Sequence, residues 1–168
     1  MKALVVYESM FGNTELIAHA VAEELESAFD VTLAPACDIP SADGVDLLVV
    51  GAPTHAFGLS RPGTREDAVR QGSTRRPDVG LREYLDVSPM LTCTAAAFDT
   101  RVDKPRLPGS AARRAHRRLR GLGCRLPAAP ESFRVSGTRG PLLPGEVDRA
   151  RQWAGRVAAA TLIERHPV

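Results

Sequence analysis

The sequence lacks the marks of several protein classes. No apolar run reaches the ~20 residues that a helix needs to cross a bilayer, so we expect no membrane span. The N-terminus does not show the charged, apolar and small-residue succession of a signal peptide. The three cysteines, Cys37, Cys93 and Cys124, are odd in number and far apart, which argues against a disulfide framework or a metal site. Together these absences predict a cytoplasmic protein.

Signals for hydrolysis and for nucleic-acid binding are also missing. The histidines, His19, His55, His116 and His166, are scattered, and no nucleophile stands beside a base, so we predict neither hydrolysis nor acyl transfer. Aromatic residues make up only 5% of the chain. None is interleaved with the Arg-rich stretch at residues 113–120, so we predict no nucleic-acid binding.

The charges that are present are unevenly distributed. The first 60 residues contain one Lys and nine acidic residues, whereas the rest of the chain contains 21 basic and 11 acidic residues. The asymmetry is explained either by ordinary solvated helix faces or by a basic surface that docks an acidic partner.

The opening stretch, residues 2–14, organises the chain. Residues 2–7 form an apolar run rich in β-branched side chains, typical of a strand buried on both faces. Apolar residues then recur at helical spacing over residues 13–29. The turn between them lies at the amino end of a helix, where unpaired N–H groups and the helix dipole favour a phosphate. An ordinary strand–helix turn capped by Asn13 is the alternative.

Strand and helix patterns alternate along the remaining chain. Further strands are predicted at residues 31–34, 45–51 and 91–98, and in two pieces within 124–135; helices are predicted near 64–71, 81–87, 110–119 and 144–162. This alternation predicts an α/β fold with a doubly wound, five-stranded parallel sheet in a single domain, residues 1–168. Residues 58–80 are either a lid-like helical insertion over the site or a mobile insertion without ligand contact.

The turn resembles a known motif. Ser9, Met10, Phe11, Gly12, Asn13 and Thr14 are similar to the phosphate loop of flavodoxins, which usually reads [ST]-x-[TS]-G-x-T after the first strand. The match holds at Ser9, Gly12 and Thr14, while Phe11 stands where a hydroxyl residue is more common. The loop has no Lys or Arg, unlike a Walker loop, and lacks the three glycines of a dinucleotide fingerprint.

Two further segments extend the resemblance. Residues 51–58, GAPTHAFG, are similar to the second ligand loop of flavodoxins, which contacts the flavin ring and ribityl chain; they add Pro53, Thr54, His55, Ala56 and Phe57. Residues 98–101 and 109–114 resemble motifs of a flavodoxin-like subgroup, and add Phe98, Asp99, Thr100 and Arg101 as a third ligand loop. His55 either meets the flavin ring or is a loop histidine in solvent, and Phe98 is the aromatic residue offered for stacking.

The resemblance implies the strand order 2-1-3-4-5, with FMN bound in the crevice between the first and third strands. It also implies a redox protein that passes one or two electrons through FMN to a partner protein or a small-molecule acceptor. Two alternatives stay open: a small FMN-dependent oxidoreductase acting on quinones or a porphyrinogen-like substrate, and a flavin-free interaction module.

Arg101 is the residue with a predicted effect on the flavin. If its charge reaches the pyrimidine edge of the ring, it stabilises the anionic reduced form and raises the potential. The alternative is a surface ion pair with Asp99 or Asp103.

Overall fold

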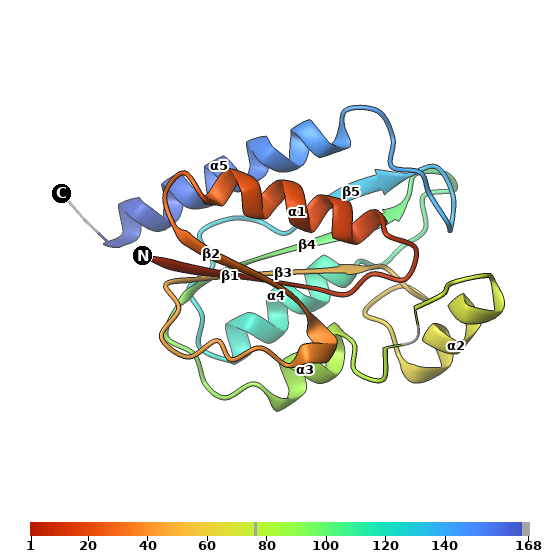
Figure 1. Cartoon of the computed structure of the whole chain (residues 1–168), viewed down its shortest axis with the longest axis horizontal. Helices are drawn as coiled ribbons and strands as arrows, with labels where there is room; N and C mark the ends of the chain where they lie inside the picture. The colour runs from red at the N-terminus through yellow and green to blue at the C-terminus, as the bar shows by residue number, and fades with distance from the viewer. Residues whose placement is uncertain (76, 166–168) are drawn as a thin grey trace.

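The computed structural model describes residues 1–75 and 77–165, so His166 lies outside the described chain. Within these residues the chain forms one parallel sheet of five strands in the order β2-β1-β3-β4-β5 (Figure 1). The strands are β1 (Lys2–Tyr7), β2 (Asp30–Pro35), β3 (Leu47–Pro53), β4 (Thr94–Val102) and β5 (Glu131–Val135). The predicted fold class and strand order are therefore confirmed.

Helices cover both faces of the sheet. Helices α1 (Asn13–Leu25) and α5 (Glu146–Arg165) lie on one face, and α3 (Leu81–Val87) and α4 (Ala111–Gly121) lie on the other (Figure 1). A single 3-10 turn, η1 (Ala36–Asp38), follows β2, and helix α2 (Pro62–Arg70) lies beyond the carboxyl ends of the strands. None of the described helices has the length and apolar character needed to cross a membrane.

The central strands are apolar because both of their faces are covered. In β1 and β3, Val5 and Val49 face the α1–α5 layer, while Val6 and Val50 face the α3–α4 layer, and each of the four is 0% exposed. Burial on both faces explains why these strands appear as unbroken apolar runs in the sequence.

The fourth strand differs from its predicted bounds. It begins at Thr94 and extends to Val102, so that the predicted loop residues Asp99, Thr100 and Arg101 lie within it. Its last part is paired on both sides, with Pro53 opposite Thr100 and Val102 opposite Val135. The neighbouring strands therefore hold these polar residues in the sheet.

Candidate functional site

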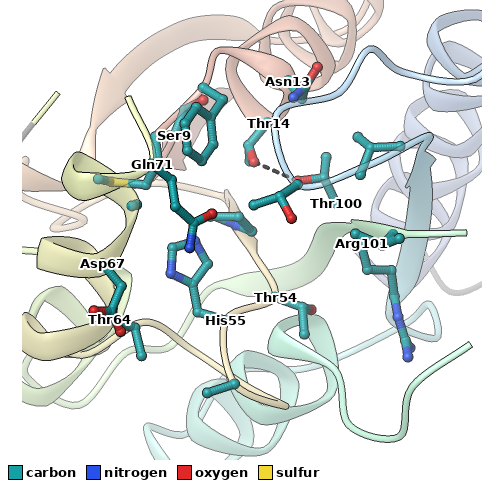
Figure 2. Close-up of a pocket in the computed structure, with 18 residues that line it drawn as sticks. Ser9, Asn13, Thr14, Thr54, His55, Thr64, Asp67, Gln71, Thr100 and Arg101 are labelled. Carbon is teal, nitrogen blue, oxygen red and sulfur yellow. Dashed lines mark hydrogen bonds between the residues drawn. The ribbon is translucent and has the colours of Figure 1, made fainter. Parts of the chain in front are cut away.

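A cavity of about 310 Å³ lies at the carboxyl ends of β1, β3 and β4 (Figure 2). Most of the predicted site residues line it: Ser9, Met10, Phe11, Asn13, Thr14, Pro53, Thr54, His55, Ala56, Thr100 and Arg101. Strands β1 and β3 are neighbours whose outgoing connections run to opposite sides of the sheet, and this is where open α/β sheets bind ligands. The sequence segments singled out above thus meet at one place.

The first segment forms the amino end of α1. Gly12 is the N-cap residue and has a left-handed backbone, with φ +93°. Its N–H donates to Ser9 Oγ at 3.1 Å. The N–H groups of the first turn that follows have no carbonyl partner within the helix, which makes this end a site for an anion.

Asn13 is not the helix cap, so that alternative is wrong. Its side-chain Nδ2 donates instead to the carbonyl of Arg139 at 3.1 Å. Gly140 also lies against this side chain, because a Cβ at Gly140 would sit 2.4 Å from Asn13 Oδ1. Asn13 therefore fastens the loop after β5 to the amino end of α1.

Two buried hydroxyls lie side by side behind this loop. Thr14 Oγ1 and Thr100 Oγ1 are 2.8 Å apart, and the two residues are 2% and 4% exposed (Figure 2). One hydroxyl donates its proton to the other, so the second hydroxyl keeps an O–H that can donate to a ligand. Ser9 Oγ likewise keeps its proton, because it accepts from Gly12. The donors suit a phosphate held by amide and hydroxyl groups.

Arg101 lines the cavity, but its guanidinium lies away from the predicted phosphate donors. Its side chain runs away from the threonine pair, and its Nη2 donates to the carbonyl of Leu107 at 2.5 Å (Figure 2). The predicted ion-pair alternative is wrong as well, because Asp103 pairs with Arg106 at 3.9 Å and Asp99 accepts from other groups.

Asp99 does not line the cavity; it positions the residues that do. The side chain is fully buried, and its Oδ2 accepts from Thr54 Oγ1 at 3.0 Å, from Ser110 Oγ at 2.5 Å and from the N–H of Ala112 at 3.0 Å. Thr54 Oγ1 in turn accepts from the N–H of Ala111 at 3.0 Å. This carboxylate joins the end of β3 to the start of α4.

The expectation for Phe98 is wrong. Its side chain is 0% exposed and packs edge-on against Phe133 and Trp153, with ring centroids 6.0 and 5.9 Å away. It occupies the space beside Gly51, where a Cβ would lie 2.0 Å from Phe98 Cζ. Phe98 therefore belongs to the core under α1 and α5 and is unable to stack on a ligand in the cavity.

A tight turn carries the second segment. His55 and Gly58 exchange backbone hydrogen bonds of 2.8 and 2.9 Å, and the two residues between them, Ala56 and Phe57, have φ of +42° and +70°. Positive φ at both central positions is typical of a type I′ turn, which normally contains Asn and Gly. The turn holds Ala56 at the cavity but leaves Phe57 outside it and 51% exposed, which corrects the expected place of Phe57.

His55 is half-buried at the cavity wall, so it is not a loop histidine in open solvent. Burial lowers the pKa of its imidazole, and the nearby positive charge of Arg65 lowers it further, against the opposing effect of Glu8. The ring is therefore neutral at pH 7 and has one N–H to donate and one nitrogen to accept.

Helix α2, in the predicted lid, lines the outer side of the cavity with Thr64, Asp67 and Ala68, and its C-cap residue Gln71 lines it too (Figure 2). It is anchored by Arg65, which is only 2% exposed. The Arg65 guanidinium donates to Ser60 Oγ at 2.9 Å and to the Glu83 carboxylate at 3.1 Å. The anchor fixes the face of α2 that is turned toward the cavity.

The buried carboxylate of Glu8 completes this anchor. It accepts from the N–H of Leu81 at 2.8 Å and from the hydroxyl of Ser60, which also bonds Arg65. The end of β1, the lid and the start of α3 are therefore joined by one buried polar network.

Sequence reasoning missed several lining residues, namely Val102, Val135 and Thr138 in addition to those of α2. Thr138 belongs to the connection that follows β5. The sequence could have indicated Thr138, because the segment at residues 136–140, SGTRG, follows a parallel strand and so lies at the same edge of the sheet as the other loops.

The family model described as flavodoxin matches residues 5–156. The chain belongs to the flavodoxin family. It is an FMN-binding electron-transfer protein, as the family implies, and the amide and hydroxyl donors of Ser9–Thr14 and the 310 Å³ cavity fit this cofactor. No curated protein sequence matches the chain significantly.

Solved flavodoxin structures share the fold. A Streptococcus pneumonia TIGR4 flavodoxin has a TM-score of 0.70 at 21% identity, covering 95% of this chain and 99% of that one. A flavodoxin from the domain Archaea has a TM-score of 0.68 at 19% identity, covering 96% and 99%. Oxidised Flavodoxin 1 from Bacillus cereus has a TM-score of 0.67 at 18% identity, covering both chains fully. At these identities the likeness shows the fold alone.

Proposed function

We propose that the chain is an electron carrier that holds the FMN phosphate with the segment Ser9–Thr14 and the flavin ring between residues 53–56 and α2. The observation that carries the proposal is the cavity at the switch point, lined by the amino end of α1 and by the paired hydroxyls of Thr14 and Thr100. When bound, FMN supplies the redox chemistry by gaining and losing one or two electrons. The protein binds it, orients it and limits access of water.

The phosphate would be bound by N–H groups of the α1 first turn and by the hydroxyls of Ser9 and Thr14. Gly12 permits the left-handed turn that aims these groups at one point. The neutral ring of His55 lies near the other end of the cavity, where its unprotonated nitrogen can accept a hydrogen bond. Because Arg101 donates to the carbonyl of Leu107, we propose that its charge does not reach the pyrimidine edge of the ring, and that it leaves the flavin potential nearly unchanged.

The FMN site is tested with Thr14→Val, which keeps the side-chain volume but removes the hydroxyl. A hydrogen bond to a charged group contributes about 1.5–3 kcal/mol, so the Kd for FMN should rise by about 10- to 150-fold. Quenching of FMN fluorescence measures this Kd. Thr32→Val, an exposed position on β2 far from the cavity, is the control and should leave the Kd unchanged. Equal affinity of Thr14→Val and the unaltered protein would overturn the assignment.

A second candidate is a small FMN-dependent oxidoreductase acting on quinones or porphyrinogen-like substrates. Two polar residues that line the cavity, Asp67 of α2 and its C-cap residue Gln71, favour it because they resemble groups that position a substrate (Figure 2). Sustained NAD(P)H-dependent reduction of a quinone by the FMN-loaded protein would establish this function. If no such turnover is observed, the electron carrier is the function that stands.

The partner of the carrier and its compartment are part of the same proposal. A redox partner protein or a small acceptor receives the electrons. The free cysteines, among them the buried thiols of Cys93 and Cys124 with sulfurs 3.9 Å apart, support a reducing, cytoplasmic compartment.

A further inference from the structure

Basic side chains gather beside the turn that borders the cavity. Arg82 donates from Nε to the carbonyl of Ser60 at 3.0 Å and from Nη2 to the carbonyl of Leu59 at 2.9 Å. Arg114 lies against Gly58, since a Cβ there would sit 2.5 Å from Arg114 Nε. Two guanidinium groups therefore flank the chain directly after the turn.

Helix α4 continues this positive surface. Apart from Gly121 at its end, its exposed residues are all arginines: Arg113, Arg114, Arg117, Arg118 and Arg120. Arg118 pairs with Asp86, but the ion pairs between described residues do not include Arg61, Arg113, Arg114 or Arg117. Burial lowers the pKa of Arg82, and the positive charges of Arg61, Arg114 and Arg118 add to this. The surface is thus positive beyond what its own carboxylates neutralise.

A second basic group lies on the other side of the turn. Arg101 on β4 and Arg134 on β5 lie opposite one another in the sheet. Burial lowers the pKa of Arg134, and the nearby positive charges of Arg101 and Arg106 lower it further. Asp103 pairs only weakly with Arg106, at 3.9 Å. The cavity therefore has basic residues on two sides of its rim.

Exposed apolar residues lie between the two basic groups. Phe57 is 51% exposed and Leu107 is 54% exposed. Their loops touch, because a Cβ at Gly109 would lie 2.2 Å from the carbonyl oxygen of Phe57. Aromatic residues and arginines are enriched where proteins bind one another, with apolar groups central and polar groups at the rim.

We propose that this rim surface, formed by Phe57, Leu107 and the arginines on either side, docks an acidic electron-transfer protein. The proposal rests on the proposed function and names its partner class. Docking here brings the partner to the open side of the cavity, because Phe57 directly follows the cavity residue Ala56. A nucleic acid would meet the arginines, but its phosphate backbone offers nothing to cover the apolar pair.

The test uses the FMN-loaded protein and three probes in calorimetric titrations: an acidic plant-type ferredoxin, a basic cytochrome c and a short DNA duplex. Each titration is run at about 20 mM and about 200 mM salt, because exposed charge pairs are screened over this range. We expect the ferredoxin to bind most tightly and to lose about tenfold in affinity at the higher salt.

Variants locate the surface. Arg113→Glu with Arg117→Glu should weaken ferredoxin binding by about tenfold or more at low salt. Arg125→Glu with Arg156→Glu makes the same charge change on exposed residues away from the cavity and should change binding by less than about twofold. Leu107→Ser should weaken binding at both salt concentrations and leave the salt dependence unaltered, because it removes only apolar contact.

The inference is wrong if cytochrome c or DNA binds more tightly than ferredoxin, or if the two charge variants weaken binding equally. FMN fluorescence quenching is measured for each variant, and FMN binding should be unchanged because none of these residues lines the cavity. Loss of FMN binding in the unaltered protein would instead overturn the proposed function, so the two failures are distinct.

Discussion

At the scale of single residues, Ala56 is held in a backbone conformation that disfavours side chains. Its φ of +42° lies in the left-handed region, which costs a residue with a Cβ roughly 1–2 kcal/mol. We expect Ala56→Gly to raise the free energy of unfolding, measured in urea, by up to about 1 kcal/mol. The gain is smaller than the full strain because glycine loses more conformational entropy on folding than alanine does.

Ala159→Gly serves as the matched control for this substitution. Ala159 is exposed in the middle of α5, where glycine costs about 1 kcal/mol relative to alanine. The same substitution should therefore raise the free energy of unfolding at Ala56 and lower it at Ala159. A loss of stability at both would show that the turn is not strained at Ala56.

The alternation of side chains between the two faces of β4 explains which site residues could be placed correctly from the sequence. Along β4, Ala95 and Ala97 face the α3–α4 layer, and Ala96 and Phe98 face the α1–α5 layer. Thr100 continues the second row, which brings it to Thr14 at the start of α1. The motif alone suggested that residues 98–101 act together as a loop, but the alternation of a strand divides them between core, anchor and cavity.

At the scale of elements, helix α2 depends on a buried arginine. Removing one partner of a buried charge network leaves the others without compensation and costs about 3–5 kcal/mol. Because the Glu83 side chain is 30% exposed, we expect Arg65→Met to lower the free energy of unfolding by less, about 2–4 kcal/mol.

Arg70→Met on the same helix provides the comparison. Arg70 pairs with Asp67 at 2.8 Å, but the two side chains are 70% and 59% exposed. Such surface pairs contribute about 0–1 kcal/mol, so this variant should be nearly as stable as the unaltered protein. A similar loss in both variants would mean that the buried network does not anchor the lid.

The order of elements could be predicted because strand and helix patterns differ in period, and the sheet order followed from the family resemblance. The ends of elements were less predictable. Asp99 and Thr100 were expected in a loop because polar residues seldom lie in an interior strand. Their partners, Ser110 and Thr14, lie 11 and 86 residues away along the chain, and such pairings are invisible before the chain is folded.

At the scale of the whole molecule, acid should destabilise the fold through a few carboxylates. Burial alone would raise the pKa values of three carboxyl groups, those of Glu15, Glu83 and Glu146. Each of them also accepts a hydrogen bond from an arginine, respectively Arg75, Arg65 and Arg149. These hydrogen bonds, with smaller effects of the same sign, outweigh burial and lower the three pKa values below the usual 4.5. Their stabilisation is therefore complete above about pH 4.5 and is lost as the pH falls through the lowered values.

Urea unfolding at a series of pH values measures this loss. We expect the free energy of unfolding to fall steadily as the pH drops below 4.5, and Glu146→Gln to make that fall shallower by removing one of the three groups. A variant whose curve parallels that of the unaltered protein would exclude Glu146 from the acid response. Fluorescence of Trp153, the single tryptophan, reports the transition from within the core.

The direction of the strands has a practical consequence. All five strands point the same way, so Met1 and the last turn of α5 lie at the end of the sheet opposite α2 and the cavity (Figure 1). A linker attached at either position would leave the pocket mouth unobstructed. The protein is thus suited to being tethered to an electrode or fused to a reductase with its cofactor face turned outward.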